Sequence, residues 1–262
     1  MIKGGAKMKS QGEVRSLVKA LTALKILATA DKDMDLGALS SRTGFPKSTL
    51  VRLLATLKAH GFVFQDPETR RYRLGWALIH LGKEAKRQLE FPVVLRPFLE
   101  QLSRETGETA SLGILDGYHA IYVDQVASNS IIKGAPPVGT PLELHCTAVG
   151  KVLLSTFSEE ELERFIREKG LPALTEHTIT NAAQLRRELE TVRKRGYAVD
   201  NEEAERGGRC VAAPVYDATG KVVAAMSIVG PTNRITLDRL EDYASIVRHV
   251  AYSASKTLGF FK

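Results

Sequence analysis

The sequence predicts a two-domain protein, with a mostly α-helical N-terminal domain that ends in a β-hairpin, a connecting helix, and a C-terminal domain of mixed α and β structure. Three observations support this fold class. Leucines recur at three- and four-residue spacing in the first third of the chain. Short alternating runs bounded by turn residues are frequent in the rest, and the excess positive charge is confined to the first third.

The charge is divided unevenly along a chain that is long enough for two cores of ordinary size. Residues 1–90 hold 17 Lys and Arg against 8 Asp and Glu, whereas residues 91–262 hold 20 against 22. A basic balance in one third of a chain is typical of a nucleic-acid-binding module attached to a neutral domain. A generally basic, solvated surface is the alternative.

The composition also bears on location and on metal sites. No stretch approaches the roughly 20 apolar residues of a membrane span, and MIKGGAKMKS lacks the apolar run of a secretory signal. We therefore expect a cytoplasmic protein. Cys146 and Cys210 are the only cysteines, and they have no CxxC spacing, so we expect reduced thiols and no metal. A zinc site that includes His145 is an alternative with no recognisable ligand spacing.

The N-terminal helices have clear boundaries. Spaced apolar residues predict a first helix over 16–30, with Leu17, Leu21, Leu24 and Leu27 on its apolar side. Asp35 is expected to cap a short second helix that Gly44 ends, and Pro46 or Lys47 opens a third helix that runs to Gly61. Two short helices separated by so few residues make a helix-turn-helix.

The third predicted helix carries the candidate DNA contacts. Its outer face and first turn hold Lys47, Ser48, Thr49 and Arg52. Arg pairs with guanine, Ser and Thr contact bases or phosphates, and a helix N-terminus attracts phosphate oxygen. Thr56 and Lys58 lie further along and are weaker candidates. An exposed polar face without a ligand is the alternative.

The stretch FVFQDPETRRYRLG predicts a β-hairpin directly after these helices, with strands over 62–65 and 71–74. Arg70, Arg71 and Arg73 lie at or beside its tip. Such a hairpin is a wing that contacts phosphates or the minor groove. We therefore expect a winged helix-turn-helix over residues 14–75 that binds double-stranded DNA, followed by an amphipathic connector over residues 76–90.

The C-terminal domain, residues 91–262, mixes both kinds of element. We expect helices over 93–106, 159–169, 182–195 and 238–258, and strands over 109–115, 120–126, 130–134, 209–216 and 222–229. Strands in hairpins with flanking helices indicate an α+β sandwich. Thr147 is expected to cap a further helix, whose first amides are free to bind a carboxylate. The run 201–205 is interpreted as a solvated loop.

Several stretches resemble one known family. The stretch LGALSSRTGFPKSTLVRLLATLKAHGFVFQDPETRRYRLG resembles the DNA-binding end of IclR-type bacterial regulators. Their effector-binding domain is similar to LELHCTAVGKVLLS, RKRGYAVDNEEAERGGRCVAAPV and VVAAMSIVGP. The resemblance implies a linker helix over residues 76–90, a GAF-like effector-binding domain, and a dimer or tetramer on a palindromic or near-palindromic operator. It also implies a pocket that the sheet floors and the loop around residues 136–144 covers.

The resemblance places the pocket at Ala148, Val149, Asp200, Cys210, Ser227 and Val229. Ala148 and Val149 match backbone donors, and the other residues match side-chain positions. Strand alternation alone puts Ser227 and Val229 on one face. Where some relatives have a second hydroxyl, this chain has Val229, which points to a less polar effector. Cys210 fits a buried core position equally well.

The expected function is that of a DNA-binding transcription regulator controlled by a carboxylate-bearing small molecule. The resemblance implies a repressor, because repression is commoner than activation in the family. An organic acid or aromatic metabolite is the expected effector. The chain shows no GxSxG, HExxH or Gly-rich cofactor loop, so we predict neither catalysis nor a cofactor. An enzyme that uses Asp200, Cys210 or His145, and an architectural DNA protein without a ligand, remain as alternatives.

Overall fold

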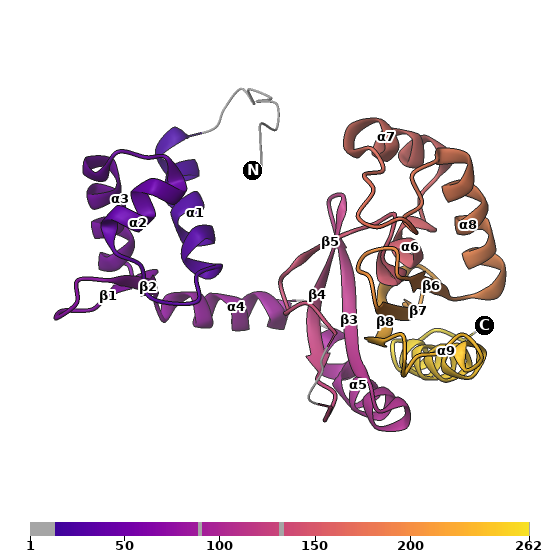
Figure 1. The fold of residues 1–262 in the computed structure, drawn as a ribbon. Coiled ribbons are helices and arrows are strands. Elements are labelled where there is room, and N and C mark those ends of the chain that lie inside the picture. The colour runs from indigo at the N-terminus through magenta and orange to yellow at the C-terminus, as the bar shows by residue number, and fades with distance from the viewer. Residues whose placement is uncertain (1–13, 89–90, 131–133, 262) are drawn as a thin grey trace. The chain divides into compact units, whose positions relative to one another are not determined.

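The structure is a computed structural model that describes residues 14–88, 91–130 and 134–261. The chain divides into two compact units, Met1–Gln88 (unit 1) and Leu89–Lys262 (unit 2). Figure 1 labels the helices and strands of both. Each unit has a hydrophobic core of its own.

Unit 1 is a winged helix-turn-helix. Its elements are α1 (Arg15–Ala28), α2 (Leu36–Thr43), α3 (Lys47–Ala59), β1 (Val63–Gln65), β2 (Tyr72–Leu74) and α4 (Ala77–Gln88). The predicted helix signals are confirmed: an oxygen of Asp35 accepts the Ala38 N–H at 2.8 Å, and Gly44 ends α2 with a φ of 71°. Pro46 then precedes the first turn of α3. The wing is the antiparallel pair of β1 and β2.

The core of unit 1 is smaller than the leucine spacing predicts. Ala23 and Leu27 of α1 pack with Leu39 of α2 and with Leu50 and Leu54 of α3. Leu17 and Leu21, which share the apolar side of α1, do not join this core, because they are 58% and 48% exposed. The first half of α1 nevertheless has an exposed apolar side. It presents an apolar stripe, the α1 stripe, made of Val14, Leu17, Val18 and Leu21.

Gly75 joins the wing to α4 at a point with no room for a side chain. Its N–H donates to the Phe62 carbonyl at 2.8 Å, and a Cβ added at Gly75 would lie 2.0 Å from the Gly61 carbonyl oxygen. We expect Gly75→Ala to destabilise unit 1 by about 1–3 kcal/mol, because rigid backbone must move. Urea unfolding followed by Trp76 fluorescence and circular dichroism measures this.

Gly82 offers a matched control for this prediction. It lies within α4, and a Cβ there would meet nothing within 4 Å. Gly82→Ala should leave stability unchanged or raise it by about 0.5–1 kcal/mol, because alanine loses less conformational freedom in a helix than glycine does. Equal stability of the two alanine variants would show that a Cβ at Gly75 does not destabilise unit 1.

Unit 2 contains a 6-stranded antiparallel sheet with the order β5-β4-β3-β8-β7-β6. The strands are β3 (Thr109–Asp116), β4 (His119–Val126), β5 (Pro141–Glu143), β6 (Ala198–Asn201), β7 (Gly208–Tyr216) and β8 (Val222–Pro231). β3, β4, β7 and β8 correspond to predicted strands. β5 and β6 were not predicted, since alternation is hard to recognise in strands of three or four residues.

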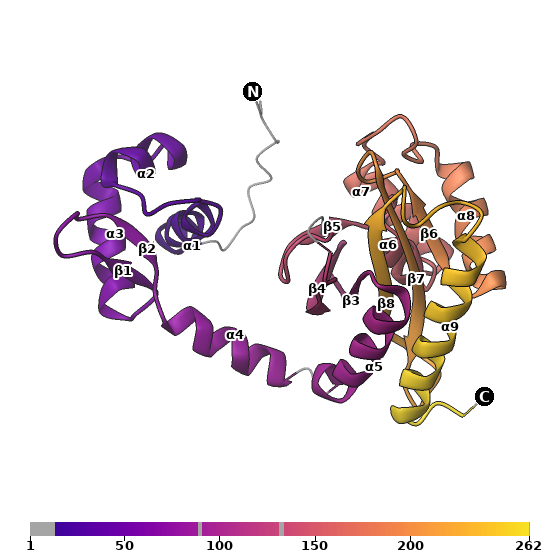
Figure 2. The same ribbon diagram turned by 60° about the horizontal axis from the view of Figure 1, so that its bottom comes forward.

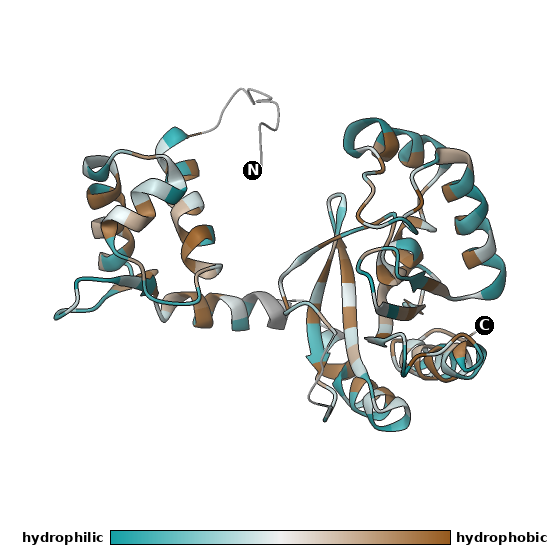
Figure 3. Ribbon diagram, in the orientation of Figure 1, coloured by the Kyte–Doolittle hydropathy of each residue, from teal (hydrophilic) through white to brown (hydrophobic). Residues whose placement is uncertain are grey.

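Helices cover both faces of this sheet, which gives the predicted α+β architecture with a GAF-like sheet (Figure 2). α5 (Phe91–Thr106) and α9 (Leu240–Thr257) pack on one face. α6 (Ala148–Leu154), α7 (Glu159–Lys169) and α8 (Ala182–Arg195) contribute to the core on the other face. Figure 3 shows hydrophobic residues along the strands between these layers.

The strand predicted over 130–134 is not found where it can be checked. Ser130 and Gly134 are outside any strand, and residues 131–133 lie outside the described residues. The loop predicted around residues 136–144 is partly strand, because its second half forms β5 beside β4. No described helix is both long enough and apolar enough to cross a membrane.

Candidate functional site

The outer face of α3 holds the predicted DNA contacts. Lys47, Ser48 and Arg52 are exposed and Thr49 is half-buried, while Leu50 and Leu54 point into the core. We call these four predicted contacts the predicted DNA-reading face. A depression of about 610 Å³ lies along part of it, lined by Ser16, Ser48, Thr49, Arg52, Leu53, Ala55 and Thr56. Ser16 of α1 was not predicted at this surface, because nothing in its local sequence brings α1 beside α3.

The wing arginines occupy an ordered turn. An oxygen of Asp66 accepts the N–H groups of Glu68 and Thr69, and the Thr69 hydrogen bond lowers the pKa of Asp66. Arg70 has a φ of 58°, a backbone conformation that is uncommon outside glycine. The Arg73 guanidinium lies over the Phe64 ring, 4.5 Å from its centre. The turn therefore holds Arg70 and Arg71 at the exposed tip and keeps Arg73 against the wing.

Unit 2 contains a cavity of about 410 Å³, which we call the ligand cavity. Three of the predicted pocket residues, Asp200, Cys210 and Val229, line it. Ala148, Val149 and Ser227 are buried and do not line it. The other residues around it include Tyr122, Pro136, Pro141, Leu142, Glu143, Thr147, Leu174, Glu205, Arg206, Arg209 and Pro231.

Strand register brings the pocket residues together from distant parts of the chain. Asp200 of β6 is the partner of Cys210 on β7, Cys210 is the partner of Val229 on β8, and Val229 is the partner of Thr109 on β3. The next row on the same face contains Ser227 and Ser111. Side chains in one row of a sheet share a face, so these positions form a continuous floor.

Ser111 is a candidate site residue that the sequence analysis missed. Its hydroxyl and that of Ser227 are fully buried, and neither has a hydrogen-bond partner of good geometry among the described residues. The alternation of polar residues at Thr109 and Ser111 was the available signal. Buried hydroxyls without partners are rare enough to require an explanation, and a ligand atom or a water molecule supplies one.

Asp200 has an unusual environment for a carboxyl group. It is 7% exposed, and one of its oxygens accepts the N–H groups of Glu203 at 2.8 Å and Ala204 at 3.3 Å. Burial raises the pKa of Asp200 to about 7, against the lowering effect of those hydrogen bonds and of Lys151. A large share of Asp200 is therefore protonated at neutral pH, and that form is a hydrogen-bond donor.

The two thiols are poor nucleophiles. Burial raises the pKa of Cys146 to about 12, and it raises the pKa of Cys210 as well. A protonated thiol in an apolar setting is chemically inert. Cys210 therefore contributes shape and a weakly polar surface to the ligand cavity.

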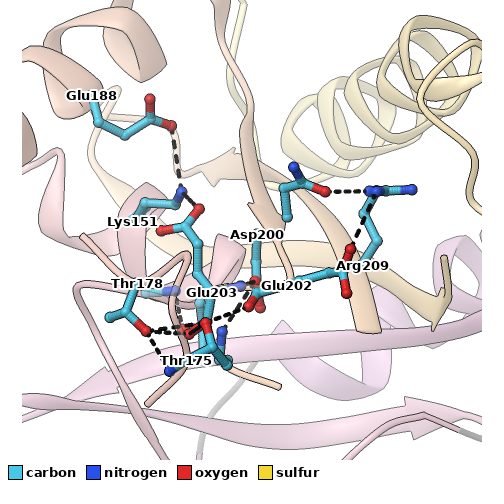
Figure 4. Close-up of polar contacts among 12 residues, drawn as sticks. Lys151, Thr175, Thr178, Glu188, Asp200, Glu202, Glu203 and Arg209 are labelled. Atoms are coloured by element: carbon cyan, nitrogen blue, oxygen red, sulfur yellow. Dashed lines mark hydrogen bonds and ion pairs between the residues drawn. The ribbon is translucent and has the colours of Figure 1, made fainter. Parts of the chain in front are cut away.

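A buried ion pair holds the segment between Asn201 and Gly208 that forms one wall of the cavity (Figure 4). Lys151 of α6 is 1% exposed, and its Nζ lies 2.5 Å from Glu203 and 3.5 Å from Glu188 of α8. Thr175 and Thr178 donate hydroxyl hydrogen bonds to the Glu202 and Glu203 carbonyls, each at 2.6 Å. The interpretation of this segment as a solvated loop is therefore wrong at Glu203, which is buried.

Both arginines that line the cavity already have oxygen partners. Arg209 is buried, and it donates to Asn201 at 2.7 Å and to the carbonyl of Ile235. Arg206 contacts a carboxylate oxygen of Glu176 at 2.8 Å. Among the groups that line the cavity, Asp200 in its protonated form is a further hydrogen-bond donor.

His145 is held by contacts within the protein. Its Nε2 is 3.0 Å from the Pro172 carbonyl oxygen, so Nε2 carries the hydrogen, and Nδ1 lies 3.9 Å from a Glu143 oxygen. Across the described ranges of the chain, no cluster of three or more His, Cys, Asp or Glu side chains is placed to hold a metal ion.

Comparison with known proteins gives concordant results for both units. Residues 16–67 match the IclR helix-turn-helix domain, and residues 85–256 match the family described as bacterial transcriptional regulator IclR C-terminal. The transcriptional repressor IclR of Escherichia coli is 34% identical over 250 residues, which cover 95% of this chain and 91% of the relative.

Solved structures have the same fold over most of their length. The Thermotoga maritima IclR structure has a TM-score of 0.79 at 32% identity and covers 94% of this chain and 99% of its own. An IclR homolog from Microbacterium hydrocarbonoxydans, described as complexed with 4-hydroxybenzoate, has a TM-score of 0.81 at 22% identity and covers 93% and 98%. With its winged helix-turn-helix and its α+β sensor fold, the chain belongs to the IclR family of bacterial transcriptional regulators.

Proposed function

We propose that this regulator is a cytoplasmic repressor that binds its operator as a dimer, and that an organic acid or aromatic metabolite in the ligand cavity changes its operator affinity. The observation that carries the proposal is the floor of that cavity. Asp200 is a buried polar group among the residues that line this cavity of ligand size, and the buried hydroxyls of Ser227 and Ser111 lie in the next row of the same sheet face.

The proposed ligand contacts combine donors with apolar walls. Asp200 in its protonated form, which lines the cavity, is a suitable partner for a ligand oxygen. The amides of Ala148 and Val149, at the start of α6, have no acceptor within that helix and are further candidates. Cys210 and Val229 leave the floor less polar than a site with more hydroxyls, which favours an aromatic or aliphatic body on the ligand.

The test measures operator affinity with and without a bound compound. An operator is first selected from a randomised duplex library with the full-length protein. Carboxylates including 4-hydroxybenzoate, benzoate and succinate are then screened for a rise in melting temperature, and each hit is added to an operator titration. We expect a hit to change operator affinity at least fivefold. A compound that stabilises the protein without changing operator affinity contradicts the proposal, and turnover of the compound indicates an enzyme instead.

The predicted DNA-reading face and the wing arginines Arg70, Arg71 and Arg73 are the proposed operator contacts. We expect Arg52→Ala to weaken binding to the selected operator by about 1–3 kcal/mol if Arg52 reads a base, with a much smaller loss on random DNA. Fluorescence anisotropy at fixed salt measures both. Arg104→Ala removes the same charge from an exposed position in unit 2 and serves as the control. Equal losses of affinity for the operator and for random DNA would indicate that Arg52 contacts a phosphate.

The α1 stripe supports the proposed dimer. Its residues are spaced three and four apart on one side of α1, they are 41–62% exposed, and none belongs to the core of unit 1. A second copy of the same helix is the proposed cover, because a palindromic operator requires two related heads.

Charges placed on the α1 stripe test this proposal. Leu17→Glu combined with Leu21→Glu should weaken self-association more than tenfold in sedimentation experiments, since buried carboxylates would face each other. Leu237→Glu, at an exposed apolar position in unit 2, is the control. A double variant that self-associates like the parent would place the dimer contact elsewhere.

A further inference from the structure

The solvent side of α3 is not uniformly polar. Val51 is 48% exposed in the middle of this helix, and its apolar neighbours Leu50 and Leu54 are buried. Val51 does not belong to the core cluster of unit 1 or to the partly buried residues packed against it. Valine is also a weaker helix former than alanine or lysine. Neither packing in this unit nor helix propensity therefore explains a valine at this position.

Helix geometry places Val51 close to the predicted DNA-reading face. At 100° per residue, Val51 and Ala55 lie between the directions of Lys47 and Ser48, and Arg52 lies beyond Ser48. Lys58, on the same side as Val51, contacts Gln65 of the wing at 3.3 Å. Val51 therefore lies on the wing side of Ser48, whereas the depression along α1 lies on the Arg52 side.

The surroundings of Val51 indicate what it contacts. Lys47, Arg52 and Lys58 lie around a small apolar patch that Val51 forms with the exposed alanines Ala55 and Ala59. A complementary partner presents a small apolar group within an anionic surface. The thymine C5-methyl in the major groove is such a group, because phosphates line both sides of the groove and apolar side chains read that methyl.

We propose that Val51 is a specificity-determining residue that packs on the C5-methyl of a thymine in each operator half-site. Ser48 and Arg52 contact neighbouring base edges or phosphates from the same helix. The inference rests on the proposed role of α3 in reading the operator. It names Val51 as the side chain that recognises one thymine in each half-site.

Deoxyuridine tests the proposal, since it differs from thymidine only by that methyl. In the operator selected by the full-length protein, each thymine is replaced in turn by deoxyuridine, symmetrically in both half-sites. We expect one position at which the replacement weakens parental binding about fourfold per half-site, as loss of one buried methyl implies. At that position Val51→Ala should bind both duplexes equally, and Val51→Thr, which keeps one methyl, should retain part of the preference.

Two controls separate this result from a folding defect or a general loss of affinity. Val51→Ala should melt at or above the parental temperature, because alanine is the better helix former. Lys58→Ala should weaken binding to the thymidine and deoxyuridine duplexes by the same factor.

The outcomes distinguish this inference from the proposed function. If deoxyuridine is tolerated at every position, or if Val51→Ala keeps the parental preference, the inference is overturned while operator binding stands. If the full-length protein selects no sequence from the library, the proposed role of α3 fails as well.

Discussion

Lys151→Met is expected to destabilise unit 2 by about 3–5 kcal/mol, because it leaves the buried carboxylate of Glu203 without its counter-ion. Glu188 is less affected, since it is partly exposed and keeps contact with water. Calorimetry on the full-length protein measures the loss. The same variant should weaken the response of operator affinity to any effector, because the wall of the ligand cavity then loses the ion pair that holds Glu203.

The matched control neutralises both partners. Adding Glu203→Gln to Lys151→Met removes the unpaired charge, so most of the lost stability should return. The defect of the single variant should also be smaller at pH 5 than at pH 8. Burial already raises the pKa of Glu203, and without Lys151 the carboxyl takes up a proton more readily. A single variant as stable as the parent at pH 8 would contradict the assignment of this ion pair.

Asp200→Asn should stabilise the protein at pH 8 by up to about 4 kcal/mol and have little effect at pH 4. The folded-state pKa of Asp200, about 7, lies above its ordinary value near 3.8, so the folded chain holds the proton more tightly than the unfolded chain does. Stability is therefore fully present below about pH 4 and declines as the pH rises towards 7. Asparagine keeps the acceptor for the Glu203 and Ala204 amides without the ionisation.

Urea unfolding of parent and variant from pH 4 to pH 8 measures this difference. The other ionisable groups that act on Asp200 or lie beside it are Glu203, Lys151, Cys210, Cys146 and Tyr122, and all are present in both proteins. Asp116→Asn, at an exposed carboxyl, is the control and should show no such trend. A difference between Asp200→Asn and parent that does not vary with pH would show that Asp200 is ionised throughout.

Local chemistry made unit 1 the more predictable part of the chain. Asp35, Gly44 and Pro46 act through hydrogen bonds and backbone angles within a few residues, so the boundaries of α2 and α3 were correct. The orientation of α1 was not predictable in the same way. Leu17 and Leu21 continue the spacing of Leu27, but they lie outside the core of unit 1, which the spacing of residues within one helix does not reveal.

The ligand cavity shows the limit of sequence patterns in unit 2. Asp200, Cys210 and Val229 lie in one row because of strand register, which depends on pairings across the whole sheet. Family resemblance supplied those positions, but it supplied neither Ser111 nor Lys151. A lysine in a short helix is normally solvated, and only the tertiary fold brings Glu203 to it.

The anchored segment beside Asp200 has a thermodynamic consequence for recognition. A receptor whose contact groups are already immobile loses little conformational entropy when a ligand binds. Selectivity among ligands then depends on how well their shapes and hydrogen-bonding groups match those of the site. Such a receptor should show rapid association and small changes in amide exchange at residues 201–208. Discrimination between related acids would then come from differences in their dissociation rates.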